Sequence, residues 1–185
     1  LGDRTKDRTD EQMRRAYGNA IRALAGKRKV AVVTPDDEPE TVVAVAMATR
    51  LAAYSFGEFK SEPAKPVETI AIITTASELR DVVDRAEIVA ASVAFARDLV
   101  NTPPNALAPA DLVEAAKNAV ADLPVKMKIW DEKALETDGC GGILGVGKGS
   151  SRLPRLARMT YKPRGAKAHL ALVGKGITFD TGGIS

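Results

Sequence analysis

The stretch LVGKGITFDTGG, residues 172–183, places a lysine and an aspartate close together among glycines. Gly174 and Gly176 remove side chains on either side of Lys175, which lets its amine approach a partner closely. Asp180 offers two carboxylate oxygens, so it could bridge two divalent cations about 3.5–4 Å apart. Lys175 could bind a metal only as the neutral amine, the form that two nearby dications favour. Spacing alone, however, favours a simpler interpretation, an ion pair between Lys175 and Asp180 on a loop.

A second glycine-rich stretch, residues 141–151, nearly matches a phosphate-binding loop. The pattern G-x-x-x-x-G-K-[ST] aligns with Gly142, Gly147 and Lys148. Gly149, however, stands where the magnesium-binding hydroxyl belongs, and the stretch predicts a strand rather than a helix after the lysine. We therefore keep nucleotide binding as an alternative function and favour a glycine-rich strand edge, where backbones lie close together.

The other candidates for catalysis are single residues. His169 is the only histidine and falls inside an expected strand, so we interpret it as structural. Cys140 is the only cysteine and has no basic neighbour in sequence, which indicates an inert, buried or half-buried thiol. One cysteine excludes an internal disulfide and fits a reducing compartment, so we expect a cytoplasmic protein.

Composition is typical of a soluble globular protein, with 45% hydrophobic and 28% charged residues. No apolar run reaches the roughly 20 residues needed to span a bilayer, so we expect no membrane partner. The charged beginning of the chain does not resemble a signal peptide.

Net charge is only +3, but basic residues cluster twice along the chain. The first cluster spans residues 27–29, and the second consists of Arg152, Arg155, Arg158, Lys162, Arg164 and Lys167. Because stacking aromatics are not interleaved with these residues, we expect a solvated surface and regard nucleic acid as an unlikely partner.

Helical and strand patterns alternate along the chain. Thr9 and Gln12 fit a capping box ahead of a first helix that ends near Gly26. We expect further helices over residues 39–54, 77–100, 109–121 and 131–139, and strands over residues 29–34, 67–74, 124–130, 143–149, 155–161 and 168–175. This alternation predicts a mostly parallel, layered α/β fold. The last strand would present Lys175 and Asp180 at its carboxyl end, where the sites of α/β sheets usually lie.

The expected helix over residues 77–100 is followed by a break. Its apolar stripe consists of Val82, Ala86, Val89, Val93 and Val100. The sequence NTPPNALAP, residues 101–109, cannot continue a helix, because proline lacks an amide hydrogen and clashes with the preceding turn. We place a domain boundary between this helix and the proline-rich loop.

The sequence VGKGITFDTGGIS closely resembles the signature V-G-K-G-[IV]-T-F-D-[ST]-G-G of the leucine aminopeptidase, or cytosol aminopeptidase, family. Three other stretches are similar to this family in collinear order, namely LAAYSFGEFK, ARDLVNTPPNALAPADLVEAA and GGILGVGKGSSRLPRLARMTYKP. Thr181 stands where serine is common, which keeps the hydroxyl. With the resemblance covering nearly the whole chain, a metal site at Lys175 and Asp180 becomes preferable to an ion pair.

The resemblance implies a chain truncated at both ends. Residues 1–76 would be the latter part of an α/β, macro-like amino-terminal domain, and residues 77–101 a linking helix. Residues 102–185 would begin a mixed-sheet α/β metallopeptidase domain. The family's catalytic lysine, its other carboxylate ligands and its catalytic arginine would fall downstream of Ser185. We therefore expect no catalytic residue within this chain and no activity from it alone.

The function implied by the resemblance is that of a metal-dependent exopeptidase with two metal ions. Such enzymes release amino-terminal residues, often leucine, from peptide substrates and assemble as homo-hexamers. Lys175 matches the lysine that coordinates one metal, and Asp180 matches the aspartate that bridges both. The expected cofactors are two divalent ions, zinc, manganese or magnesium. A second alternative is a non-catalytic interaction protein that kept the fold and lost the metals.

Overall fold

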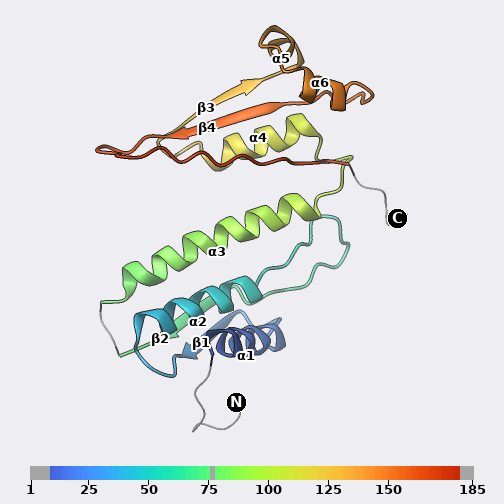
Figure 1. Ribbon diagram of the computed structural model, residues 1–185. Helices are drawn as coiled ribbons and strands as arrows, with labels where there is room; N and C mark the ends of the chain where they lie inside the picture. Colours follow the sequence, from blue (N-terminus) through green and yellow to red (C-terminus); the bar gives the residue numbers. More distant parts are fainter. Residues whose placement is uncertain (1–8, 76–77, 180–185) are drawn as a thin grey trace. The chain divides into compact units, whose positions relative to one another are not determined.

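The structure is a computed structural model that describes residues 9–75 and 78–179 (Figure 1). Two compact units, Leu1–Asn101 and Thr102–Ser185, each contain helices and a small sheet, so the predicted α/β class is confirmed. The elements in chain order are α1 (Asp10–Ala23), β1 (Lys29–Val33), α2 (Pro39–Ala52), β2 (Thr69–Ile73), α3 (Arg80–Asn101), α4 (Pro109–Ala119), β3 (Val125–Trp130), α5 (Glu132–Thr137), α6 (Gly141–Gly147) and β4 (Leu156–Tyr161). Within the described residues, every helix is too short or too polar to cross a membrane.

The first unit is built on a parallel pair of strands. The register aligns Lys29 with Thr69 and Val33 with Ile73. A parallel pair needs a long crossover between its strands, and α2 lies in that crossover. Helices α1 and α2 pack against each other, and the core beneath them contains Ile21, Val32, Val45, Ala53 and Val67.

Local sequence signals determine where the first elements begin and end. Thr9 Oγ1 accepts a hydrogen bond from the Gln12 amide at 3.3 Å, and Gln12 Oε1 accepts one from the Thr9 amide at 3.1 Å. The predicted capping box is therefore confirmed. Gly26 has a φ of 87°, which favours glycine, and its amide donates to the Lys65 carbonyl at 2.7 Å. This turn directs the chain from α1 into β1.

Helix α3 packs against α2 through alanines rather than through the predicted valine stripe. Ala86 and Ala90 are buried, whereas Val89, Val93 and Val100 are 40%, 39% and 84% exposed. The stripe prediction is wrong for these three valines. Small side chains let two helices approach closely, and apolar character alone does not reveal which residues take that position.

A polar cluster joins the end of α3 to the segment that follows α2. Tyr54 Oη donates a hydrogen bond to Asp98 Oδ1 at 2.7 Å and accepts one from Asn101 Nδ2 at 3.0 Å. The Arg97 guanidinium lies 3.8 Å from the centre of the Tyr54 ring, a favourable cation–π geometry. These contacts fix the last turn of α3 to the segment that follows α2 within the first unit.

The second unit contains an antiparallel pair of strands, β3 and β4. The register pairs Val125 with Tyr161 and Trp130 with Leu156. The expectation of mostly parallel strands is therefore right for the first unit and wrong for the second. Because α5 and α6 form a compact connection, the chain enters β4 at the end where it leaves β3. Trp130 is buried there, and its Nε1 donates to Asp138 Oδ2 at 2.6 Å.

Two strand predictions in the second unit are wrong, although the strand predicted over residues 155–161 is confirmed by β4. Residues 143–149 fall mostly within helix α6. Residues 168–175 follow an extended path without pairing to a described strand (Figure 1). A strand requires a hydrogen-bonding neighbour, which a local apolar pattern does not specify.

The substitution Tyr54→Phe tests the polar cluster. It removes the hydroxyl that Asp98 and Asn101 share, so we expect the free energy of unfolding to fall by about 1 kcal/mol, the usual net value of a hydrogen bond. Urea unfolding followed by circular dichroism measures this change. Tyr161→Phe is the matched control, because Tyr161 is 61% exposed. An equal loss of stability in both variants would contradict a stabilising role for the Tyr54 hydroxyl.

Alkaline pH provides a second test of the same cluster. Burial, and then the hydrogen bond to Asp98, raises the pKa of Tyr54 above its ordinary value of 10.0. Since the folded pKa exceeds the unfolded one, the stabilisation is present below pH 10 and is lost as the pH rises through the folded pKa. We expect wild-type stability to fall more steeply with alkaline pH than that of Tyr54→Phe. Superimposable stability curves from urea unfolding at each pH would refute this.

Candidate metal-binding segment

Lys175 lies in the extended segment that follows β4 in the second unit (Figure 1). Its side chain is exposed and forms no ion pair with a described residue. A Cβ at Gly174 would meet open space, whereas one at Gly176 would lie 3.0 Å from Leu112 Cδ2 of α4. The glycines therefore leave room beside Lys175 and allow the backbone to lie close to α4.

Asp180, the second predicted ligand, lies outside the described residues, so the pairing of Lys175 with Asp180 stays a prediction. Within residues 9–75 and 78–179, no three His, Cys, Asp or Glu side chains come together as a metal-binding group. The described residues thus offer one donor, whereas protein metal sites usually use three or more.

The glycine-rich segment at residues 141–151 has the wrong geometry for a phosphate-binding loop. Gly141–Gly147 form the short helix α6, and Lys148 caps its carboxyl end. A phosphate loop needs the opposite order, with glycines in a loop ahead of a helix that starts near the lysine. A Cβ at Gly147 would lie 2.6 Å from Pro154 Cδ. Close packing against Pro154 therefore explains why residue 147 is a glycine. This packing occurs in a helix, whereas the sequence predicts a strand edge.

The single cysteine and the single histidine lie in different segments of the second unit. Cys140 is half-buried at the start of α6, with its Sγ 4.0 Å from the Asp138 carbonyl oxygen. This position agrees with the half-buried thiol expected from the sequence. His169 is exposed in the extended segment, so the strand position predicted for it is wrong.

The longer basic cluster of the sequence separates into two groups in the structure. Arg152 donates to the carbonyl oxygens of Pro104 at 2.7 Å and Asn105 at 3.1 Å, which holds the proline-rich loop. Arg155 pairs with Glu132 at 2.7 Å, and both side chains are half-buried. These two arginines are therefore structural. The other members, Arg158, Lys162, Arg164 and Lys167, are exposed and form no ion pair with a described residue.

Two further basic residues, Lys126 and Lys128, are exposed beside this group, although they lie outside both basic clusters of the sequence. The register of β3 and β4 places Lys128 directly opposite Arg158. The signal was present in the sequence VKMKIW, because a period of two places both lysines on one face of a strand. Only the pairing with β4 shows that this face continues the later basic cluster.

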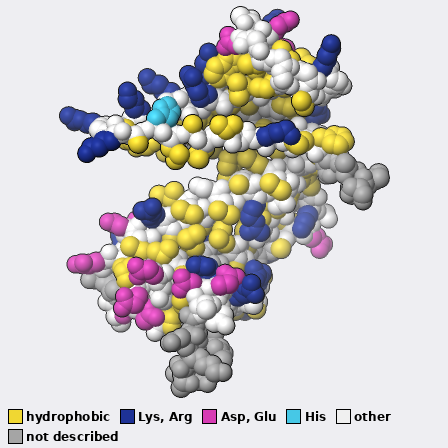
Figure 2. Space-filling view, viewed as in Figure 1, with side chains coloured by type: hydrophobic (Ala, Val, Ile, Leu, Met, Phe, Trp, Pro, Cys, Tyr) yellow, Lys and Arg dark blue, Asp and Glu magenta, His cyan; other side chains and the backbone are white. Residues whose placement is uncertain are grey.

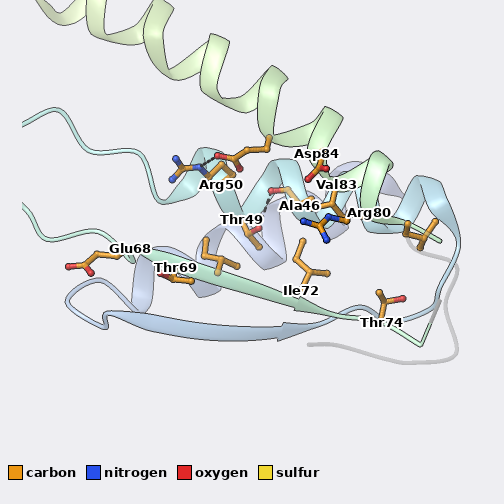
Figure 3. A pocket seen from close by; sticks show the side chains of 13 residues that line it. Ala46, Thr49, Arg50, Glu68, Thr69, Ile72, Thr74, Arg80, Val83 and Asp84 are labelled. Atoms are coloured by element: carbon orange, nitrogen blue, oxygen red, sulfur yellow. Dashed lines mark hydrogen bonds and ion pairs between the residues drawn. The ribbon is translucent and has the colours of Figure 1, made fainter. Parts of the chain in front are cut away.

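A cavity of about 510 Å³ opens in the first unit between α2, β2 and α3 (Figure 3). Ala46, Ile72 and Val83 form apolar parts of its wall. Arg50 and Glu87 also line it and form an ion pair at 2.7 Å. Histidine and cysteine are absent from its lining, so this cavity offers no soft metal ligand.

Comparison with known proteins identifies the family. Residues 1–63 match the N-terminal domain of the cytosol aminopeptidase family, and residues 94–185 match its catalytic domain. The chain belongs to the cytosol aminopeptidase family. It is 47% identical over 186 residues to a probable cytosol aminopeptidase of Micrococcus luteus and 43% identical over 183 residues to one of Leifsonia xyli. The resemblance inferred from the sequence motifs is confirmed.

The alignments cover nearly all of this chain but a smaller share of each relative in the family. They include 96% of the chain and 36% of the Micrococcus luteus protein, and 97% and 37% for the Leifsonia xyli protein. Among solved structures, the bottromycin maturation enzyme BotP in complex with Mn is similar, with a TM-score of 0.75 and 25% identity. That match covers 84% of this chain and 34% of BotP.

The geometry of α6 predicts no nucleotide binding. We expect isothermal titration with ATP or GTP to show no saturable heat, and Lys148→Ala to behave like the wild type. Lys133→Ala is a suitable control, because it removes an equivalent charge from the neighbouring helix α5. Micromolar binding that Lys148→Ala abolishes and Lys133→Ala retains would restore the phosphate-loop interpretation.

Proposed function

We propose that the full-length protein is a metal-dependent aminopeptidase that releases amino-terminal residues, with a leucine-type preference, from peptides. The observation that carries this proposal is the match of the chain to both domains of the cytosol aminopeptidase family. The VGKG motif around Lys175 supports it, because the lysine is exposed and has no ion pair with a described residue. The 185-residue chain alone is proposed to be inactive, since it spans 36% of its Micrococcus luteus relative.

The proposed cofactors are two divalent ions, zinc, manganese or magnesium, held in part by Lys175 and Asp180. The manganese in the name of the similar BotP structure supports use of a divalent metal. Divalent ions bound there would supply Lewis acidity toward a peptide carbonyl. Lys175 would hold them through its amine and Asp180 through its carboxylate. The other ligands and the catalytic residues are proposed to come from the length that the relatives have and this chain does not span.

The proposed organisation keeps residues 1–76 as part of the amino-terminal domain, residues 77–101 as a linking helix and residues 102–185 as the start of the catalytic domain. The family matches support a linking role for α3, because the N-terminal match ends at residue 63 and the catalytic match begins at residue 94, inside α3. We further propose that the full-length protein is cytoplasmic and forms a homo-hexamer.

Substitution of the two proposed ligands tests the function in a protein of the relatives' length. We expect Lys175→Met and Asp180→Asn each to lower bound metal, measured by mass spectrometry after dialysis. Hydrolysis of a leucyl anilide should fall by about 100-fold or more, because even the loss of a residue supporting a metal ligand costs roughly 10–100-fold.

Lys148→Ala controls for the loss of a positive charge at another position of the second unit and should retain metal and activity. Full hydrolysis of leucyl substrates after exhaustive chelation would overturn the proposal. If both ligand variants kept a cellular function that the wild type supports, the non-catalytic alternative would be correct.

A further inference from the structure

A hollow of about 310 Å³ in the first unit is lined by four arginines and by no acidic residue. Arg14, Arg15 and Arg22 come from α1, Arg97 comes from α3, and the remaining wall belongs mainly to α2. Figure 2 shows that the acidic side chains of this unit gather toward the left of the view, and most of its Lys and Arg side chains toward the right. We call the space lined by the four arginines the arginine hollow.

The part of the arginine hollow that α2 contributes is apolar. Met47 and Leu51 are half-buried there, and Ala48 is buried. Methionine is flexible and adapts its shape to a ligand. Ligand pockets usually have volumes of about 300–1,000 Å³, so the arginine hollow lies at the lower end of that range. Its size and lining therefore suit a small molecule that combines negative charge with a short carbon chain.

Gly18 shows that the space beside the arginines is not required for helix packing. It follows Arg14 and precedes Arg22 by four residues each, so the three positions share one face of α1. A Cβ at Gly18 would lie 3.7 Å from Ala52 Cβ and 3.9 Å from the Ala48 carbonyl oxygen, which are ordinary contact distances. It would also lie 3.9 Å from Arg22 Nη2. Because glycine destabilises a helix relative to alanine, α1 loses stability here and gains open space beside a guanidinium.

Two of the arginines are neutralised by carboxylates at the start of α1. Arg14 lies 3.6 Å from both Asp10 and Glu11, and Arg15 lies 2.7 Å from Glu11. These pairs are exposed, and exposed ion pairs contribute little to stability. They nevertheless balance two positive charges with two negative ones, so the net charge of the arginine hollow depends on its other two arginines.

Arg22 and Arg97 form no ion pair with a described residue. Arg22 Nη2 donates a hydrogen bond to Asn19 Oδ1 at 2.7 Å. Arg97 Nη1 donates to the Leu51 carbonyl oxygen at 3.3 Å, and its guanidinium stacks on the Tyr54 ring. Both guanidinium groups are thus held in place by neutral partners, and because each carries several N–H groups, donors remain for a ligand. The arginine hollow therefore has an excess of two positive charges.

We propose that the arginine hollow binds a small organic dicarboxylate. Two uncompensated cations call for two negative charges, and a guanidinium binds a carboxylate through two parallel hydrogen bonds. The cations are spread out, because Arg22 and Arg97 belong to different helices and Arg14 lies about 12 Å from Arg22 along α1, at a rise of 1.5 Å per residue. Two carboxylates joined by a short carbon chain suit this spread and the apolar wall of α2. Inorganic phosphate is a poorer fit, because it is compact and has no carbon chain.

Isothermal titration with glutarate, in a protein of the relatives' length, tests the proposal. We expect saturable binding that Arg22→Gln weakens by about 10-fold or more, because a hydrogen bond to a charged group is lost. Butyrate, which has one carboxylate, and inorganic phosphate should each bind about 10-fold more weakly than glutarate, for the same reason. Arg28→Gln is the matched control, because it removes the same charge from an 81% exposed side chain outside the lining.

Gly18→Ala distinguishes a ligand site from a purely structural role of this region. The added methyl group should raise the midpoint of urea unfolding, because alanine is the better helix former. The same methyl group should weaken glutarate binding, because it occupies space beside Arg22 Nη2. Misfolding cannot explain a variant that is more stable and binds less. Unchanged binding in Gly18→Ala, or a lower unfolding midpoint, would contradict the proposal.

Four other results would overturn the proposal. These are the absence of saturable heat with glutarate, equal weakening by Arg28→Gln, phosphate or butyrate binding as tight as that of glutarate, and loss of glutarate binding in Lys175→Met. The last result would place glutarate at the proposed metal ligands and not in the arginine hollow. The proposal does not depend on the proposed aminopeptidase function, because leucyl hydrolysis is measured separately in Arg22→Gln and should remain at the wild-type value.

Discussion

A lysine can bind a metal ion only as a neutral amine, because an ammonium group has no lone pair to donate. This constraint governs what may surround Lys175 if it is a ligand. A neighbouring carboxylate without metal would stabilise the ammonium form and compete with the ion. Residues 154–179 contain no Asp or Glu, and Lys175 has no ion pair with a described residue. The carboxylate expected nearby, Asp180, is itself a proposed ligand and would be engaged by the metals.

Two arginines of the second unit stabilise its loops and connections, although in the sequence they look like members of a solvated basic cluster. Arg152 binds two carbonyls of the proline-rich loop, and the half-buried Arg155 pairs with Glu132 at the start of α5. Breaking such a pair leaves a charge in a partly buried place, which costs more than the loss of an exposed pair. The second unit therefore uses two of its basic residues to fix its connections.

Features that depend on neighbours in sequence could be predicted, and features that depend on distant partners could not. The capping box of Thr9 and Gln12 involves residues three apart, so the sequence alone reveals it. The antiparallel register of β3 and β4 and the alanine contact of α3 with α2 depend on what lies opposite. Lys175 and Asp180 match a family motif, and both their ligand roles and the position of Asp180 stay predictions.

The register of the β3–β4 ribbon links its stability to its charge. Lys126, Lys128 and Arg158 occupy one side, and Met127, Ile129, Ala157 and Met159 occupy the other. A slip of one residue in either strand would exchange its two sides and bring lysines to the apolar one. The alternation that protects the fold from such a slip is therefore the same alternation that gathers the cations on the opposite surface. Acidic residues at the positions of these cations would relieve the repulsion between Lys128 and Arg158.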